Sequence, residues 1–269
     1  MNSLSGMINI MTVALVITTF NWPSALNLVL SSVANQTRIP DEVLVADDGS
    51  NYETQDIIER WADRLPIIHA WLPNVDFRAA RARNLALLKA TSDYVIMVDG
   101  DCLMPHTFIE NHLRLKSAKK VIAGNRFLIG VEATAEILAA ASSGASLPPS
   151  LFQSFKFRYL PLGWLRDGRP RAWKVVRTCN LALPRDVAVV IAGFNESYVG
   201  WGREDSDFVI RLLVCGFKIR SGRFAVCVLH LHHEQNSRES LSNNDSLLNK
   251  AVELGVAAQG RVKSVLREP

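Results

Sequence analysis

Long hydrophobic runs are the first feature that this 269-residue sequence lacks. The apolar run within residues 1–20 is too short to span a bilayer, and no later stretch of 18 apolar residues is free of charge. No Lys or Arg precedes that first run, so it lacks the positive flank of a secretory signal peptide. These absences predict a soluble, cytoplasmic protein.

Cysteine is also scarce. The chain holds four cysteines, and none of them form a CxxC pair. A disulfide framework needs a short, Cys-rich chain, and a structural zinc site usually needs closely spaced pairs. We therefore expect reduced thiols and no structural zinc.

A phosphate-binding loop rich in glycine and lysine is missing as well. The segment that follows the first predicted strand is TTFNWP, residues 18–23. A nucleotidyltransferase would also use a parallel sheet and a metal held by acids, but it would need such a loop there. This alternative is therefore disfavoured.

The excess of positive charge is small and uneven. The net charge is +4, and residues 155–174 hold six Lys or Arg against one Asp. Such a stretch suits phosphates, an anionic glycan or a membrane surface, and it is equally typical of a solvated loop. Peripheral contact with the inner face of a membrane through 155–174 is one hypothesis, and no nucleic-acid partner is expected.

Short apolar runs rich in β-branched residues alternate with amphipathic helical stretches. The runs are nearly continuous in hydrophobicity, as strands buried on both faces are. The expected strands are residues 12–18, 42–46, 65–72 and 94–98, and the expected helices are residues 24–35, 53–64 and 78–90. This alternation predicts an α/β fold with a largely parallel sheet. Later segments predict a strand pair in 120–130, a helix that ends at Gly216 and a last strand in 224–234.

Polar and charged groups follow each of the four predicted strands. They are TTFN (18–21), DDGS (47–50), PNVDFRAARARN (73–84) and DGDC (99–102). Ligands of parallel α/β sheets bind beyond the carboxyl ends of the strands. We therefore expect these groups to meet in one binding site.

Two acids close the fourth strand. Asp99 and Asp101 are separated only by Gly100, which allows a tight turn and close approach of a ligand. Paired carboxylates suit Mn²⁺ or Mg²⁺, which usually keep phosphate oxygens as further ligands. At least one upstream arginine, at a helix N-terminus, is expected to pair with phosphate; the arginines are Arg78, Arg81 and Arg83. The pattern predicts a metal-bound diphosphate.

Two further pairs of acids add to the predicted site. Asp47 and Asp48 either form an Asx-type turn or place one acid against a nucleobase or ribose, and we favour the second. Glu204 and Asp205 open a helix, where acids stabilise the first turn, but Trp201 just before them offers a flat face to a sugar. A carboxylate beside such a platform is a plausible general base.

Three histidines close the last predicted strand. In a strand His230 and His232 point to one side and His233 to the other. The cluster predicts that one of them is a metal ligand. The residues alone do not choose between His230 and His232.

The chain resembles family 2 glycosyltransferases with the GT-A fold. The resemblance covers roughly residues 12–235 and rests on an ordered set of segments: VITTFN, VADDGS, DFRAARARN, YVIMVDGDC and GFNESYVGWGREDSDF. The second half is similar to the galactosyltransferase-like and chondroitin-polymerase-like branches. The resemblance implies a nucleotide-sugar donor, usually a UDP-sugar, with Mn²⁺ or Mg²⁺, and a glycan or lipid-linked acceptor in cell-surface polysaccharide synthesis.

The resemblance also implies roles for individual residues. The donor would contact Thr18, Phe20, Asp48, Arg83, Asp99 and Gly100. The metal would bind Asp101, Asp99 and His232, with His230 as the alternate. Trp201 and Gly202 would line the sugar pocket. Asp205 would be the catalytic base of an inverting transfer, with Glu204 orienting a hydroxyl.

The resemblance has limits. Ala192 and Asn195 stand where the family often has a glycine and an acid, and residues 131–176 match no family segment. We expect one compact domain, with nucleotide-sugar binding in 1–125, acceptor binding and the base in 126–235, and a polar helical extension in 236–269. A non-catalytic binding module is the other alternative, but it would have no use for Glu204 and Asp205.

Overall fold

The computed structural model describes residues 11–142, 149–153, 166–167, 172–234 and 237–265. Most of the basic stretch 155–174, and with it the predicted membrane contact, lies outside these residues. No helix in the described part of the chain is both long and apolar enough to cross a membrane.

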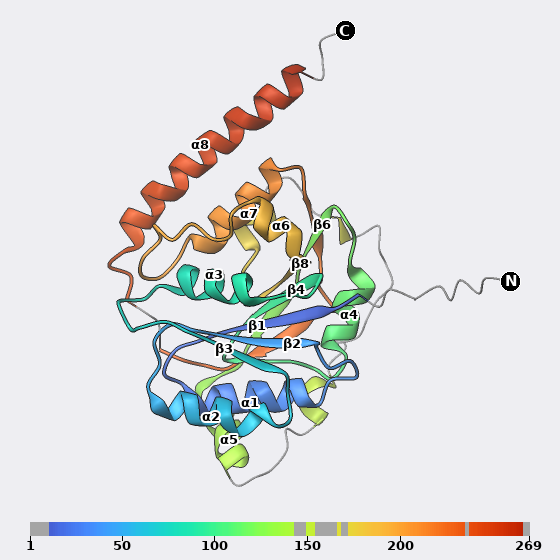
Figure 1. The fold of residues 1–269 in the computed structure, drawn as a ribbon, viewed down its shortest axis with the longest axis vertical. Helices are drawn as coiled ribbons and strands as arrows, with labels where there is room; N and C mark the ends of the chain where they lie inside the picture. Colours follow the sequence, from blue (N-terminus) through green and yellow to red (C-terminus); the bar gives the residue numbers. More distant parts are fainter. Residues whose placement is uncertain (1–10, 143–148, 154–165, 168–171, 235–236, 266–269) are drawn as a thin grey trace, which may run out of the picture.

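A seven-stranded sheet forms the centre of the molecule (Figure 1), in the order β3-β2-β1-β4-β8-β6-β9. Its strands are β1 (Val13–Thr19), β2 (Glu42–Asp47), β3 (Ile67–Trp71), β4 (Tyr94–Asp99), β6 (Lys120–Ala123), β8 (Asn180–Pro184) and β9 (Lys218–Ser221). The first four strands pair in parallel, and β8 is antiparallel to both β4 and β6. The predicted α/β fold with a mostly parallel sheet is confirmed.

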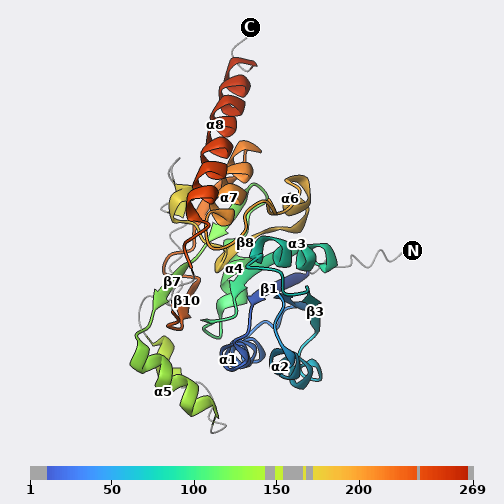
Figure 2. The same cartoon turned by 90° about the vertical axis from the view of Figure 1, so that its left-hand side faces the viewer.

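Helices cover both faces of this sheet. They are α1 (Pro23–Ala34), α2 (Tyr52–Ala62), α3 (Ala79–Lys89), α4 (Phe108–Leu115), α5 (Val131–Ser142), α6 (Arg185–Val190), α7 (Glu204–Val214) and α8 (Leu241–Val265), with short 3₁₀ turns η1 (Pro149–Phe152) and η4 (Ala172–Val175). In Figure 1, α1, α2 and α5 lie below the sheet and α3, α6 and α7 above it. Figure 2 shows α8 extending away from the body toward the C-terminus.

The alternation of side chains along each strand divides the core into two layers. In β1, Leu15 and Ile17 pack with the α1 and α2 side, whereas Ala14 and Val16 pack with the α3 and α7 side, and all four are fully buried. Burial on both faces explains why the strands are continuous in hydrophobicity. The predicted strands and helices of the first hundred residues are confirmed to within about two or three residues at each end.

The second half departs from the prediction in two places. Residues 120–130 form two strands, as expected, but β6 joins the large sheet and β7 (Asn125–Leu128) joins a separate three-stranded sheet. That small sheet has the order β5-β10-β7, with β5 (Cys102–Leu103) and β10 (Cys227–His230). The two strands therefore do not pair with each other, and the last strand ends at His230.

Gly216 ends α7 as predicted. Its φ is +86°, and the amides of Gly216 and Phe217 donate to the carbonyls of Leu213 and Leu212. This is the Schellman arrangement, in which a glycine adopts the left-handed conformation at low cost. It returns the chain to β9, which begins at Lys218.

Candidate active site

A cavity of about 890 Å³ lies at the carboxyl ends of β1 and β4, between the large sheet, the N-terminus of α7 and the end of β10. Every site residue that the sequence predicted lines this cavity: Thr18, Phe20, Asp48, Arg83, Asp99, Gly100, Asp101, Trp201, Gly202, Glu204, Asp205, His230 and His232. Segments more than 200 residues apart in the chain therefore meet in one place. The expected convergence at the sheet edge is present.

The two acids after β2 have different environments. Asp47 accepts hydrogen bonds from the Ser50 amide at 2.8 Å and from His69 Nε2 at 2.9 Å, so it stabilises the turn. Asp48 lines the cavity, and its Oδ2 accepts from the Arg78 amide at 2.6 Å. Burial raises the pKa of Asp48 to about 6, although the hydrogen bond from Arg78 opposes the rise. The sequence left open whether these acids form a turn or face a ligand. In the structure Asp47 stabilises the turn and Asp48 lines the cavity.

Gly49 makes this turn possible. Its φ is +97°, and a Cβ there would lie 2.4 Å from the Cα of Asn74. A side chain at this position would therefore clash with backbone as well as strain the turn. Gly100 is similarly close to the end of β1, since its amide donates to the Thr18 carbonyl at 2.7 Å.

Arg83, on α3, is the buried cation of the cavity. Its guanidinium lies 3.3 Å from Asp99 Oδ1, 3.1 Å from Glu204 Oε1 and 3.7 Å from Asp205 Oδ1. Its Nε also donates to Thr18 Oγ1 at 3.1 Å. Burial alone would lower the pKa of Arg83, but the neighbouring carboxylates raise it above the ordinary value. Arg83 therefore joins the end of β4 to the start of α7.

Two of the carboxylates around Arg83, those of Asp99 and Glu204, have raised pKa values. Burial raises the pKa of Asp99 to about 6, with Arg83 opposing the rise and Asp101 adding to it. Burial likewise raises the pKa of Glu204 to about 7, with repulsion from Asp205 adding and Arg83 opposing. Perturbed acids gathered in one cleft are typical of functional sites.

Asp205 is held in a defined orientation. Its Oδ1 accepts a 2.6 Å hydrogen bond from Thr178 Oγ1, and its Oδ2 accepts from the Thr178 amide at 3.3 Å. Its neighbour Glu204 accepts a hydrogen bond from Arg83, so the two acids at the start of α7 have different hydrogen-bond donors and share the charge of Arg83. An oriented carboxylate in an open cavity is able to accept a proton from a bound hydroxyl.

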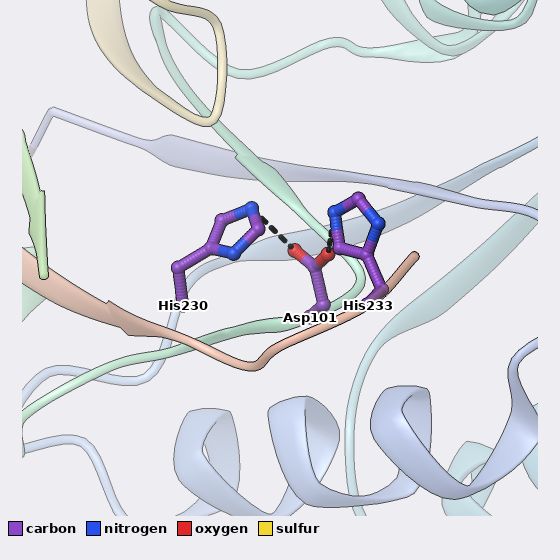
Figure 3. A group of neighbouring side chains, drawn as sticks. All are labelled: Asp101, His230 and His233. Carbon is purple, nitrogen blue, oxygen red and sulfur yellow. Dashed lines mark ion pairs between the residues drawn. The ribbon is translucent and has the colours of Figure 1, made fainter. Parts of the chain in front are cut away.

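A second group joins one carboxylate and two imidazoles (Figure 3). Asp101 Oδ1 lies 3.5 Å from His230 Nε2, and Asp101 Oδ2 lies 3.5 Å from His233 Nε2. The three ligand atoms all lie within 4.8 Å of one another. Asp99, which the sequence predicted as a further ligand, is outside this group and points to Arg83 instead.

The structure does not place His232 in this group. β10 ends at His230, so the strand alternation that paired His230 with His232 stops there. The Leu231 amide then donates to the Asp101 carbonyl, and the His232 amide donates to Thr134 Oγ1. The sequence named His232 first and His230 as the alternate, and it did not name His233 as a ligand. The position of His233 depends on an irregular segment after β10 that no side-chain pattern marks.

When the two imidazoles are neutral, their Nε2 atoms face Asp101 as acceptors. The Nδ1 of His230 lies 2.9 Å from the Leu231 carbonyl, and the Nδ1 of His233 lies 2.6 Å from the Glu234 carbonyl. A carbonyl oxygen only accepts, so each Nδ1 carries the proton when the ring is neutral, and each Nε2 is left as an acceptor. Burial lowers the pKa of His230, which favours the neutral ring, although Asp101 opposes this. Two acceptor nitrogens facing a carboxylate fit a bound cation.

The loop before α7 carries Trp201. The side chain is 39% exposed, and the Arg238 guanidinium lies 5.4 Å from the centroid of its ring. Gly200, Gly202 and Arg203 all have positive φ, so the loop has a conformation that glycines favour. Trp201 is thus at the cavity as expected, with one face contacting an arginine that the sequence did not indicate.

The comparison with protein families agrees with this geometry. The model of glycosyl transferase family 2 matches residues 14–167, more than half of the chain. This chain belongs to glycosyl transferase family 2. A second model, described as the N-terminal domain of galactosyltransferase, matches residues 167–234, which include Trp201, Glu204 and Asp205.

Curated relatives include a glucosyltransferase and two synthases. A validoxylamine A glucosyltransferase from Streptomyces hygroscopicus subsp. limoneus is 26% identical, covering 88% of this chain and 56% of that protein. A hyaluronan synthase from Pasteurella multocida is 25% identical, covering 90% of this chain and 26% of that protein. A chondroitin synthase from Escherichia coli is 24% identical, covering 90% of this chain and 37% of that protein. The chain thus spans between about a quarter and a little more than half of the length of these relatives.

Solved structures confirm the GT-A-like fold. S. aureus TarS 1–349 in complex with UDP-GlcNAc superposes with a TM-score of 0.66 at 18% identity, covering 90% of this chain and 66% of that one. The same region of TarS in complex with UDP gives a TM-score of 0.64. At this identity the likeness establishes the fold of the family 2 domain.

Proposed function

We propose that this chain is a metal-dependent, inverting glycosyltransferase that moves a sugar from a UDP-sugar to a hydroxyl of a glycan or lipid-linked saccharide. One observation carries the proposal: a single cavity holds an oriented acid at the start of α7, an acid-and-histidine group just after β4, and buried Arg83 between Asp99 and Glu204. The UDP-GlcNAc named for TarS supports a nucleotide-sugar donor.

The donor's nucleotide would bind at the ends of β1 and β2. Asp48 would accept a hydrogen bond from the uracil, and Phe20, which is 43% exposed, would contact the base or ribose. Asp99 would contact the ribose, with Gly100 allowing the close approach. Arg83 would approach the diphosphate.

The metal would be held by Asp101, His230 and His233. Its chemistry would be neutralisation of the charge that accumulates on the leaving diphosphate. Carboxylates suit Mg²⁺ and Mn²⁺, whereas imidazoles suit transition ions. This mixed donor set therefore favours Mn²⁺ over Mg²⁺.

The transfer would be a single displacement. Asp205 would take the proton of the acceptor hydroxyl as its oxygen attacks the anomeric carbon. The bond from that carbon to the diphosphate oxygen breaks, and UDP leaves with the electron pair. Because attack and departure are on opposite faces of the sugar, the anomeric configuration inverts. The hydrogen bond from Thr178 would fix the orientation of the Asp205 carboxylate. Glu204, which accepts a hydrogen bond from Arg83, would orient a hydroxyl.

We propose cell-surface polysaccharide synthesis as the setting, because the curated relatives include a hyaluronan synthase and chondroitin synthases. A cytoplasmic location with peripheral membrane contact fits this setting. The sugar transferred is chosen by the part of the cavity near Trp201 and Gly202.

The direct test is hydrolysis of a small panel of donors with Mn²⁺: UDP-glucose, UDP-galactose, UDP-N-acetylglucosamine and UDP-glucuronate. Glycosyltransferases commonly leak donor to water, so at least one UDP-sugar should release UDP. A binding module would bind a donor, visible as a thermal shift, and release nothing. Binding without release in the whole panel would contradict an enzymatic role.

The histidines give a paired prediction. His233→Ala should weaken Mn²⁺ binding by at least about 10–100-fold, since removing a direct ligand costs no less than removing its supporting partner. His232→Ala, its neighbour in the chain, should change Mn²⁺ binding less than twofold. Titration of each variant with Mn²⁺ alone, followed by the paramagnetic signal of the free ion, measures both. The reverse order would show that His232 is the ligand.

A further inference from the structure

The start of α8 packs directly against the loop that carries Trp201. Asn244 is only 2% exposed, and its Nδ2 donates to the Gly202 carbonyl at 3.0 Å and to the Val199 carbonyl at 3.1 Å. The same nitrogen lies 3.5 Å from the Trp201 carbonyl. One buried side-chain amide therefore donates hydrogen bonds to two backbone carbonyls of a loop that has no helix or strand of its own.

Residues at the start of α8 and just before it add to this contact. A Cβ on Gly200 would lie 2.5 Å from Ser240 Oγ, and a Cβ on Gly202 would lie 3.5 Å from Leu241 Cδ1. Asp245 forms an ion pair with Arg203, the residue that precedes Glu204. Positions 241, 244 and 245 share one face of a helix, so a single face of α8 covers the loop.

The loop needs an external support. Gly200, Gly202 and Arg203 have φ values of +74°, +101° and +82°. Arg203 has a Cβ, so this left-handed conformation is unfavourable for it and persists only where the surroundings hold it. On the other side the Gly200 amide donates to the Phe77 carbonyl at 2.8 Å. The loop is thus held between the segment before α3 and the start of α8.

We propose that Asn244 is a positioning residue, which fixes the loop Val199–Arg203 so that Trp201 and the first turn of α7 face the bound sugar. Asn244 does not line the cavity, so it acts through the loop. The inference rests on the proposed function, since it assigns Trp201 and Gly202 to the sugar pocket. It gives the start of α8 a role in sugar binding.

The test compares Asn244→Ala with Asn243→Ala, an exposed asparagine on the same helix. UDP, which lacks the sugar, should bind both variants within twofold of the wild type, because the nucleotide contacts lie elsewhere in the cavity. With the best-hydrolysed UDP-sugar of the panel, kcat/KM should fall about 10–100-fold in Asn244→Ala only, since small misplacements of positioning groups have effects of this size. Equal kcat/KM in the two variants would overturn the proposal.

A second variant keeps the test decisive if Asn244→Ala does not fold. Asp245→Ala removes the ion pair to Arg203 at a half-exposed position and leaves no buried group unpaired. It should lower kcat/KM for the UDP-sugar by about two- to fivefold without changing UDP binding. A value equal to that of Asn243→Ala would then overturn the proposal.

Hydrogen exchange separates this inference from the proposed function. In Asn244→Ala, amides of the peptide spanning residues 199–206 should exchange at least about tenfold faster than in Asn243→Ala, because the loop loses its support. This readout needs no substrate. If the wild type neither binds UDP nor hydrolyses any donor, the proposed function fails, whereas unchanged exchange overturns the positioning role by itself.

Discussion

Asp205→Asn should lower the rate of transfer or donor hydrolysis by about 10²–10⁴-fold while leaving UDP binding within twofold of the wild type. Asparagine is nearly the same size and keeps an oxygen that accepts from Thr178 Oγ1, which lies 2.6 Å from Asp205 Oδ1. The fold of the α7 start should therefore persist. What is lost is the carboxylate that takes the proton from the attacking hydroxyl.

Asp207→Asn is the matched control for this prediction. It lies two residues later on the same helix, but its carboxylate faces Arg211 Nε at 2.8 Å and does not line the cavity. This variant should lose stability and keep kcat. Full activity in Asp205→Asn would contradict the assignment of the base, and Glu204→Gln would then be the variant to measure.

Arg83→Met should lower the free energy of unfolding by about 3 kcal/mol at pH 8, the lower end of the range for breaking a buried charge cluster. Within the described part of the chain, Arg83 is the single cation paired with Asp99, Glu204 and Asp205, and methionine fills much of its volume without any charge. The lower end applies because the Asp99 side chain keeps 30% of its surface exposed. Urea unfolding followed by circular dichroism measures the change.

The same variant should show a defined pH dependence. The pKa of Glu204 is already raised from 4.5 to about 7, and Arg83 opposes that rise, so removing Arg83 raises it further. An acid whose pKa is higher in the folded than in the unfolded state binds protons on folding, so its contribution to stability falls as pH rises through that interval. Arg83→Met should therefore be less destabilised at pH 5.5 than at pH 8.

Arg81→Met provides the control on the same helix. Arg81 is exposed, so its replacement should change the unfolding free energy by less than about 0.5 kcal/mol at either pH. A similar loss in both variants, or a loss in Arg83→Met that grows as the pH is lowered, would show that the guanidinium does not hold the three carboxylates together.

Much of the fold was predictable because its first half follows simple rules. Strands such as Val13–Thr19 are apolar on both faces, and the intervening helices are amphipathic, so periodicity identifies each element. Parallel strands bring their carboxyl ends to one edge, which places Asp48, Asp99 and Asp101 around one cavity. These positions follow from topology alone.

The parts that were not predicted depend on long-range contacts. Whether Asn125–Leu128 pairs with its neighbour or with Cys227–His230 is decided a hundred residues further along the chain. His233 comes close to Asp101 because the chain continues past β10 as an irregular segment. Asn244 is a polar residue in a polar helix, and nothing in its local sequence marks it as buried.

The central claim is that Asp101, His230 and His233 hold a divalent cation against the donor's diphosphate. Calorimetric titration with UDP, in Mn²⁺ and in excess EDTA, tests it most directly, with Asp101→Asn measured beside the wild type. The wild type should bind UDP at least about 10²-fold more tightly in Mn²⁺, a difference near 3 kcal/mol, and Asp101→Asn should lose that difference. Equal affinity of the wild type for UDP in Mn²⁺ and in EDTA would contradict the account.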